Sequence, residues 1–192
     1  MSTKADPTVE VKFDQEAYER LSTVTDTPAD FLHEAAMDRV ELAEAIAYTR
    51  EEGFHGPKGF AKLADDTYPT WPLGSVLGIE LESMGDGESR WRMEVGAEHA
   101  NPMGTMHGGV LCDIGDAALS TAFMSTLEDS QMFTTVDLRV NFLRPVRTGR
   151  LVAIGRVIHR GHTIGMAESE VTNEDDELVA KLSGTCMTLG DG

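Results

Sequence analysis

One apolar helical run sets the strongest limit on how this chain can fold. Residues 108–127 repeat Ala, Leu, Ile and Phe at helical spacing, and Asp116 lies in their midst. A helix that is apolar on nearly every side needs cover on nearly every side. A carboxylate buried with it costs free energy unless it is paired, hydrogen-bonded or used in chemistry. The rest of the chain must therefore supply both the cover and a reason for Asp116.

Strand patterns lie on both sides of this run. Two alternating stretches within residues 75–97 flank the turn "GDGE", which is typical of a hairpin. Four more stretches follow the helix, joined by the links "RPVRTG", "RGH" and "NEDDE", and they are residues 133–143, 150–160, 163–173 and 177–189. Short links favour antiparallel neighbours, and "NEDDE" is expected to be a solvated hairpin tip. The order predicts an α+β fold with one long central helix wrapped by a curved antiparallel sheet.

Residues 1–70 read as an N-terminal extension, and residues 71–192 as the main domain. The extension contains a helix that begins at "TPAD", where Thr27 can cap, Pro28 suits the first helical position and Asp30 favours the first turn. Its apolar positions up to a stop at Gly53 are Phe31, Ala35, Val40, Leu42, Ala43 and Ile46. We expect this amphipathic helix to pack on the main domain or on a partner subunit. The Gly- and Pro-rich residues 54–74 are expected to be a connecting segment.

Charge and composition exclude several classes of function. The 192 residues include 33 acidic and 16 basic ones, and the formal net charge of −17 repels nucleic acid. No apolar run approaches the ~20 residues that a membrane span needs, and residues 1–20 hold no signal-peptide core, so we expect a cytoplasmic protein with no membrane partner. Cys112 and Cys186 fit no zinc spacing and are expected to be buried free thiols.

The start of the central helix carries the candidate chemistry. Gly108 and Gly109 lie where the first helical N–H groups have no intrahelical partner, and such donors favour an oxyanion that develops on a carbonyl. Asn101 could add a side-chain donor, and His107 could orient the turn or touch a substrate. Asp116 is roughly 12 Å further along the helix, so it reaches such a carbonyl only from a neighbouring copy across a two-fold axis.

Two alternatives stay open from spacing alone. Asp113 lies three residues before Asp116 on a neighbouring face of the helix, and the spacing does not choose between the two carboxylates. The glycines and His107 could also form nothing more than a local turn and cap, with both aspartates solvated or paired.

From about Trp71 to Leu189 the chain resembles the hotdog-fold acyl-CoA thioesterases, in their phenylacetate-pathway (PaaI-like) branch. The resemblance rests on four blocks in the family's order and spacing: "HANPMGTMHGGVLCDIGDAA", "FTTVDLRVNFLRPVRTGRL", "GRVIHRGHTIGMAE" and "LVAKLSGTCM". It implies a hotdog fold and hydrolysis of an acyl-CoA thioester by a homo-oligomer, either a dimer or a dimer of dimers. The first ~70 residues fall outside the resemblance.

The resemblance also implies roles for particular residues. In that family the acidic residue nine positions after the motif histidine is the nucleophile or the general base, and counting from His107 selects Asp116. The family's asparagine six positions before the histidine helps to hold the thioester carbonyl, and it matches Asn101. The first glycine after the histidine supplies the main polarising N–H, and it matches Gly108. A Ser or Thr at the start of the next strand helps to place water, and the aligned residue is Thr135, with Thr134 beside it.

Two basic segments are candidates for binding the phosphates of CoA. Arg144, Arg147 and Arg150 cluster in "FLRPVRTGR", and a solvated turn would suffice for Arg150. The resemblance implies that this loop and a second turn hold the nucleotide; the turn residues are His159, Arg160, Gly161, His162 and Thr163. CoA is part of the substrate, so no separate cofactor is expected.

Other polar and soft residues suggest no further site. His33, His55 and His99 are scattered, so no metal is expected. Five methionines could line an acyl pocket or simply fill the core, namely Met37, Met103, Met106, Met124 and Met166. The rival function is a non-catalytic hotdog module that binds acyl-CoA as a sensor or scaffold, because one fold hosts many functions. Asn101, Gly108 and Asp116 together favour hydrolysis, since binding needs no carboxylate near the thioester. A hotdog hydratase is a weaker rival.

Overall fold

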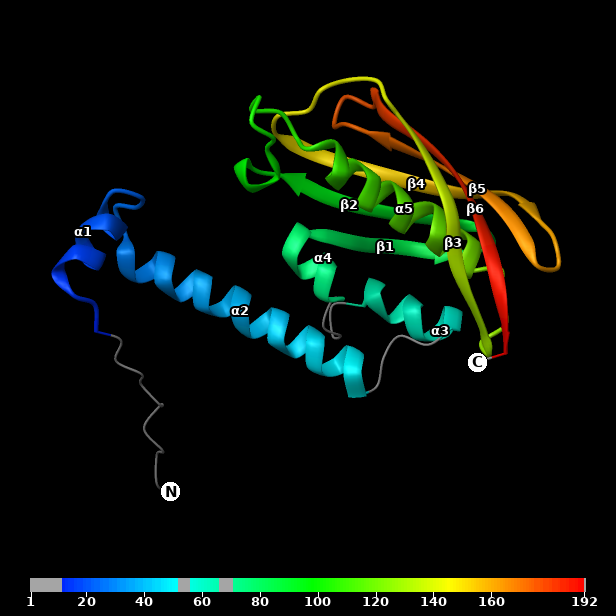
Figure 1. Ribbon diagram of the computed structural model, residues 1–192, viewed down its shortest axis with the longest axis horizontal. Coiled ribbons are helices and arrows are strands. Elements are labelled where there is room, and N and C mark those ends of the chain that lie inside the picture. Colours follow the sequence, from blue (N-terminus) through cyan, green and yellow to red (C-terminus); the bar gives the residue numbers. More distant parts are fainter. Residues whose placement is uncertain (1–11, 52–55, 66–70, 192) are drawn as a thin grey trace. The chain divides into compact units, whose positions relative to one another are not determined.

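The computed structural model describes residues 12–51, 56–65 and 71–191 (Figure 1). The chain divides into two compact units, Met1–Val40 and Glu41–Gly192. Among the described residues, none of the helices has both the length and the apolar character to cross a lipid bilayer.

The first helices are α1 (Gln15–Ser22) and α2 (Pro28–Glu51). The Asp14 side chain caps α1 by accepting from the Ala17 N–H at 2.8 Å. Helix α2 begins at Pro28 as predicted. The Thr27 hydroxyl, which is the expected cap of the helix, lies 3.4 Å from the Thr25 hydroxyl. Ala45 is the buried residue of α2, and Phe31 and Val40 on the expected docking face are exposed. The helix is therefore confirmed, and its packing on the main domain or on a partner subunit stays a prediction.

The predicted connecting segment is helical where the structure describes it. It contains α3 (Gly56–Ala61), a 3-10 turn η1 (Lys62–Ala64) and α4 (Pro72–Leu77), with Pro72 in a first turn that tolerates proline. Apolar side chains of these turns pack against the core, and Trp71 meets Trp91 edge-on with ring centroids 6.1 Å apart. Glycine and proline suggested a loop, and burial of these aromatic and aliphatic side chains overrides that local preference. The domain boundary near residue 70 stays a prediction.

One six-stranded antiparallel sheet forms the body of the second unit (Figure 1). Its strands are β1 (Ile79–Gly85), β2 (Glu88–Val95), β3 (Gln131–Phe142), β4 (Gly149–Arg160), β5 (Ile164–Thr172) and β6 (Leu178–Asp191). The short turn η2 (Ala97–His99) and the long helix α5 (Gly108–Met124) come between β2 and β3. All six predicted strands and the central helix are present, which confirms the expected hotdog architecture, and "NEDDE" is an exposed turn.

The strand order β1-β2-β4-β5-β6-β3 corrects one expectation. The link "RPVRTG" does not join neighbours, because β3 pairs with β6 at the sheet edge and β4 pairs with β2. Three strand spacings amount to roughly 14 Å, a gap that some six extended residues can cross. The buried Val146 anchors the crossing, and its carbonyl accepts from the Met106 N–H at 2.8 Å. Link length alone cannot separate a hairpin from such a crossing.

Helix α5 is seated on the sheet by close backbone contact. A Cβ added to Gly155 of β4 would lie 2.2 Å from the Ala118 carbonyl oxygen, so only glycine allows this approach. Two buried serines donate to helix carbonyls, Ser89 to Ala118 at 2.7 Å and Ser169 to Gly115 at 2.8 Å. These contacts hold the helix at one depth and one rotation against the sheet.

The chain by itself covers most of α5. Ala117, Ala118, Leu119, Ala122 and Phe123 are all buried within the chain itself. The half-buried positions of the middle of the helix form what we call the open stripe, which consists of Cys112, Asp113, Asp116 and Ser120. The surface that the chain does not cover by itself is therefore narrow and partly acidic.

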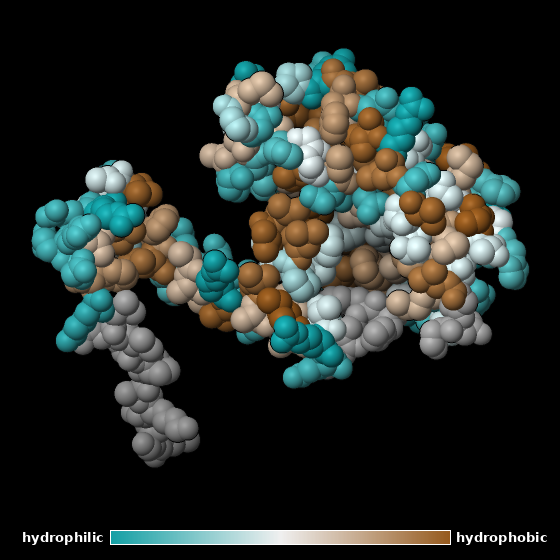
Figure 2. All heavy atoms as spheres, viewed as in Figure 1, coloured by the Kyte–Doolittle hydropathy of each residue, from teal (hydrophilic) through white to brown (hydrophobic). Residues whose placement is uncertain are grey.

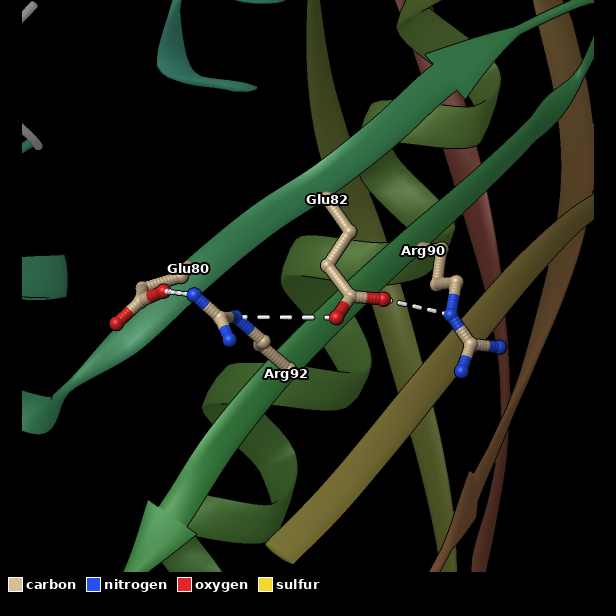
Figure 3. Close-up of polar contacts among 4 residues, drawn as sticks. All are labelled: Glu80, Glu82, Arg90 and Arg92. Atoms are coloured by element: carbon tan, nitrogen blue, oxygen red, sulfur yellow. Dashed lines mark hydrogen bonds and ion pairs between the residues drawn. The ribbon is translucent and has the colours of Figure 1, made fainter. Parts of the chain in front are cut away.

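The outer face of the sheet carries cross-strand ion pairs (Figure 3). Glu82 lies at the irregularity in the β1–β2 register, which lets its carboxylate reach Arg90 at 2.6 Å and Arg92 at 3.7 Å. Arg92 also pairs with Glu80. All four side chains are substantially exposed, so each pair contributes at most about 1 kcal/mol. This face is solvated, and the candidate site residues lie on the helix side.

Gly155→Ala should lower the free energy of unfolding by roughly 1–3 kcal/mol or more, because strand and helix backbones must separate to admit the methyl group. Urea denaturation measures the change. Gly96→Ala is the matched control, since a Cβ at Gly96 meets only the mobile Glu98 carboxylate. Equal stability of the two variants would contradict the close seating of α5.

Candidate active site

The turn before α5 is organised by the Asn101 side chain. Its Oδ1 accepts from the Met103 N–H at 2.8 Å, and its Nδ2 donates to the Thr105 hydroxyl at 2.9 Å. The Asn101 N–H donates to the Thr105 carbonyl at 2.7 Å, which closes the turn. Asn101 therefore shapes the loop that precedes the helix, and its carboxamide keeps one further N–H for an outside acceptor.

His107 caps α5 with its ring. The Nδ1 atom accepts from the Gly109 N–H at 2.9 Å, and the His107 carbonyl accepts from the Val110 N–H at 3.0 Å. The local-cap interpretation of His107 is thus correct for its geometry. Within the described part of the chain the Gly108 N–H, the first of the helix, has no hydrogen-bond acceptor. The helix dipole adds to the positive potential at this donor.

Phe142 is a site residue that the sequence did not suggest. A Cβ built on Gly108 would lie 3.0 Å from the Phe142 ring, so the last residue of β3 flanks the free donor. The two residues are far apart in the chain, and no spacing pattern connects them. Phe142 is 56% exposed, so it does not belong to the core.

Asp116 lies on the open stripe and is tied to β3. The Thr135 hydroxyl donates to its Oδ1 at 3.2 Å, which leaves Oδ2 without a described partner. Burial raises the pKa of the Asp116 carboxyl above its ordinary value of 3.8, the hydrogen bond from Thr135 opposes this, and the charge of Asp113 raises it further. The structure therefore brings Asp116 and Thr135 together as a half-buried pair, and Thr134 is exposed beside it.

Two thiols and a second carboxyl surround this pair. Burial raises the pKa of Cys186 to about 11, with the Asp116 charge adding to the effect, so its thiol stays protonated at neutral pH. Cys186 is buried as expected, and Cys112 is half-buried. Burial also raises the pKa of the Asp113 carboxyl.

The first basic cluster lies at the N-terminal end of α5. Arg144 donates to the Leu178 carbonyl at 2.6 Å and lies 3.6 Å from Glu177, so it braces the β5–β6 turn. Arg147 and Arg150 line a hollow of about 300 Å³, whose other lining residues include Glu174 and Asp175. Arg147 lies in the crossing link and is exposed. Unlike Arg144, it forms no ion pair with a described carboxylate.

The second basic cluster lies at the opposite end of β4. The Arg160 guanidinium stacks on the Phe123 ring 5.0 Å from its centroid and donates to the Gly161 carbonyl and, at 3.3 Å, to that of His162. Arg160 thus holds the turn in shape, with Gly161 donating to Ile164 at 2.9 Å. His159, His162 and Thr163 are exposed around it.

Within one chain the two basic clusters are far apart. Strand β4 separates them with 12 residues, or roughly 35–40 Å of extended chain. The Gly108 donor shares its end with Arg144 and Arg147, whereas Phe123 and the Arg160 turn mark the other end of α5. The expectation that both clusters grip one nucleotide therefore requires two chains.

Other sequence candidates contribute little here. Among the described residues, no group of three or more His, Cys, Asp or Glu side chains could hold a metal ion, and His55 lies outside those residues. His99 is buried and its Nδ1 accepts from the Gly96 N–H at 3.0 Å, which is a structural role. Of the five methionines only Met106 is buried, and Met37, Met103 and Met166 are exposed.

Comparison with known proteins adds a family. Residues 103–180 match the thioesterase superfamily. A protein of Halobacterium salinarum is 36% identical over 123 residues, which are 62% of this chain and 81% of the relative. The acyl-coenzyme A thioesterase 13 of Pongo abelii is 31% identical over 101 residues, which are 52% of this chain and 71% of that one. The Escherichia coli PaaI protein from the phenylacetic acid degradation operon is similar in three dimensions, with a TM-score of 0.61 and 27% identity over 68% of this chain and 93% of that one.

Asp116→Asn should raise the free energy of unfolding at pH 7, because an asparagine keeps an acceptor for Thr135 and carries no charge to bury. A raised pKa in the folded state means that ionised Asp116 weakens the fold above the unfolded pKa. The gain should therefore be full at neutral pH and vanish below about pH 4. Urea denaturation at both pH values and one protein concentration tests this, and a loss of stability at pH 7 would contradict it.

Proposed function

This chain belongs to the thioesterase superfamily and is a hotdog-type thioester hydrolase of the PaaI-like kind, and on that premise we propose that it hydrolyses an acyl-CoA to a carboxylic acid and free CoA. One observation carries the proposal. The helix that presents the unpartnered Gly108 N–H at its start also presents the half-buried Asp116–Thr135 pair on its open stripe. An oxyanion donor and a carboxylate of raised proton affinity are the two parts that thioester hydrolysis needs.

The proposed reaction uses these two parts in turn. The thioester carbonyl oxygen accepts from the Gly108 N–H, which stabilises the negative charge that develops there. Asp116 either attacks the carbonyl carbon or takes a proton from the water that does so. The carbon–sulfur bond then breaks, and the electron pair leaves with the sulfur of CoA. Where Asp116 is the nucleophile, water then hydrolyses the mixed anhydride between Asp116 and the acyl group, which frees the carboxylic acid. Thr135 holds one carboxylate oxygen of Asp116 so that the other faces the reaction.

Two chains are needed to bring the parts together in this proposal. Gly108 and Asp116 of one helix are roughly 12 Å apart, which is too far for one carbonyl group. A two-fold axis beside α5 and β3 would set the start of one helix against the Asp116 of the other. Strand β3 supports this because it is an edge strand of 12 residues with exposed Met132, Val136, Leu138 and Phe142. Figure 2 shows apolar side chains over the region of α5 and β3.

The same axis would complete the CoA site. It brings the link with Arg147 from one subunit beside the Arg160 turn of the other, although β4 keeps these groups apart in a single chain. We assign phosphate contact first to Arg147, and then to His162 and Thr163, because Arg144 and Arg160 already serve their own turns. His159 and Gly161 belong to the same turn. Asn101 and His107 act by shaping the approach to Gly108.

Release of free thiol from a panel of short alkyl, long alkyl and aryl acyl-CoAs tests the function. The wild-type protein should release CoA, and Asp116→Ala should lose at least ~100-fold in kcat while CoA still binds. Undiminished turnover by Asp116→Ala would overturn the mechanism. Stoichiometric binding of acyl-CoA by the wild type, without thiol release from any substrate, would support the non-catalytic sensor instead.

A pair of variants at one position tests the oxyanion donor. Gly108→Pro removes the N–H, yet proline suits the first helical position, and His107 with φ −66° and ψ 131° already has the conformation that precedes proline. Gly108→Ala keeps the N–H and adds a similar bulk beside Phe142. Gly108→Pro should lower kcat by ~10²–10³-fold relative to Gly108→Ala. Equal rates would exclude this donor.

Mixed oligomers of Gly108→Pro and Asp116→Ala chains extend that test. If each site takes Gly108 from one subunit and Asp116 from the other, a mixed dimer holds one intact site. Random mixing should then restore about a quarter of the wild-type activity. No restoration in verified mixed dimers would place both residues of a site in one chain.

A further inference from the structure

The open stripe of α5 holds a second carboxyl that the proposed reaction does not use. Asp113 lies one helical turn before Asp116, and side chains at this spacing have Cβ atoms about 5–6 Å apart. Both are half-buried, so water screens their charges less than it would at the surface. Within the described residues, Asp113 makes no side-chain hydrogen bond and no ion pair. No described group therefore neutralises the negative charge of Asp113.

The groups around Asp116 are all acidic or neutral. On its own helix they are Asp113 and Cys112, and from the packed strands they are Thr135 of β3 and Cys186 of β6. Asp137 of β3 is exposed and accepts from the Thr185 hydroxyl at 3.1 Å, and its charge affects the pKa of Cys186 but is not among the causes of the raised pKa of Asp116. No lysine, arginine or histidine among the described residues pairs with either helix carboxylate. Asp113 is thus the other charged residue of the open stripe, and its charge adds to the raised pKa of Asp116.

Building on the function proposed above, we propose that Asp113 is a positioning residue that acts through Asp116: its negative charge makes the reactive carboxylate a stronger proton acceptor. Such a carboxylate is a better base toward water and a better nucleophile toward a thioester carbonyl, so the effect holds for either role of Asp116. Asp113 itself forms and breaks no bond. In the reaction the proton from water goes to Asp116, and the electron pair of the carbon–sulfur bond leaves with CoA.

This arrangement makes the activity more sensitive to acid. Hydrolysis needs ionised Asp116, so activity falls as pH drops through the pKa of that carboxyl. The charge of Asp113 raises this pKa, and the acid limb of the rate profile therefore lies at a higher pH than burial alone would set. Removing the charge should move the limb in the acid direction and weaken the base on the plateau by a small factor.

The pH profile of kcat/KM for Asp113→Asn tests the proposal. The acid limb should move down by a few tenths of a pH unit to about one unit, while kcat at pH 8 falls no more than severalfold and KM stays the same. Asp113→Glu keeps the charge and should return the limb toward the wild-type position. Asp137→Asn is the matched control, because it removes a nearby charge that does not act on Asp116.

Two results would overturn this role. An unchanged limb in Asp113→Asn would show that the two carboxyls are not coupled, and loss of activity at every pH would make Asp113 itself catalytic. A failure of the proposed thioesterase function is recognised separately, because the wild-type protein would then release no thiol from any acyl-CoA of the panel. A limb that moves equally in Asp137→Asn would assign the effect to net charge and would also overturn the proposal.

Discussion

Everything that the candidate site does depends on how α5 is seated on the sheet. The backbone of β4 at Gly155 touches the backbone of α5 at Ala118, and buried serines on β2 and β5 donate to helix carbonyls. Contacts of this kind fix depth and rotation together, since a side chain at Gly155 or a turn of the helix would break them. The seating therefore decides which positions of α5 form the open stripe and which become core.

Two electrostatic consequences follow from that seating. At its start the helix exposes a donor, and the His107 ring takes the next N–H for itself, so that the Gly108 N–H is the one left to meet a ligand. Near its middle the helix exposes two carboxyls of raised pKa, and no cation of the described residues forms an ion pair with either. Such carboxyls stay protonated to a higher pH than solvated ones. This suits acid–base catalysis but lowers the free energy of unfolding. The fold tolerates this loss of stability because the rest of α5 packs in the apolar core.

The separation of functional groups along α5 and β4 explains why a homo-oligomer enters the proposed mechanism. Donor and reactive carboxylate lie on one rigid helix, and no side-chain rotation shortens the roughly 12 Å between them. The two basic turns are likewise held apart, because they lie at opposite ends of strand β4. A two-fold axis reverses one copy relative to the other, so the two halves of a site meet only when two chains pair.

The sequence by itself determined the strands, the central helix and the candidate residues that they carry. Alternation and helical spacing identified the six strands and α5, because period and turn residues are local properties of the chain. The helix start at Gly108 was visible for the same reason, whereas spacing left Asp113 and Asp116 as alternatives and only the family resemblance selected Asp116. Tertiary structure alone decided that β3 leaves β4 for the far edge, that residues 56–64 are helical, that Phe142 flanks Gly108, and that the Thr135 hydroxyl donates to Asp116. These depend on contacts between residues distant in the chain, and no local pattern records which distant surfaces will be buried together.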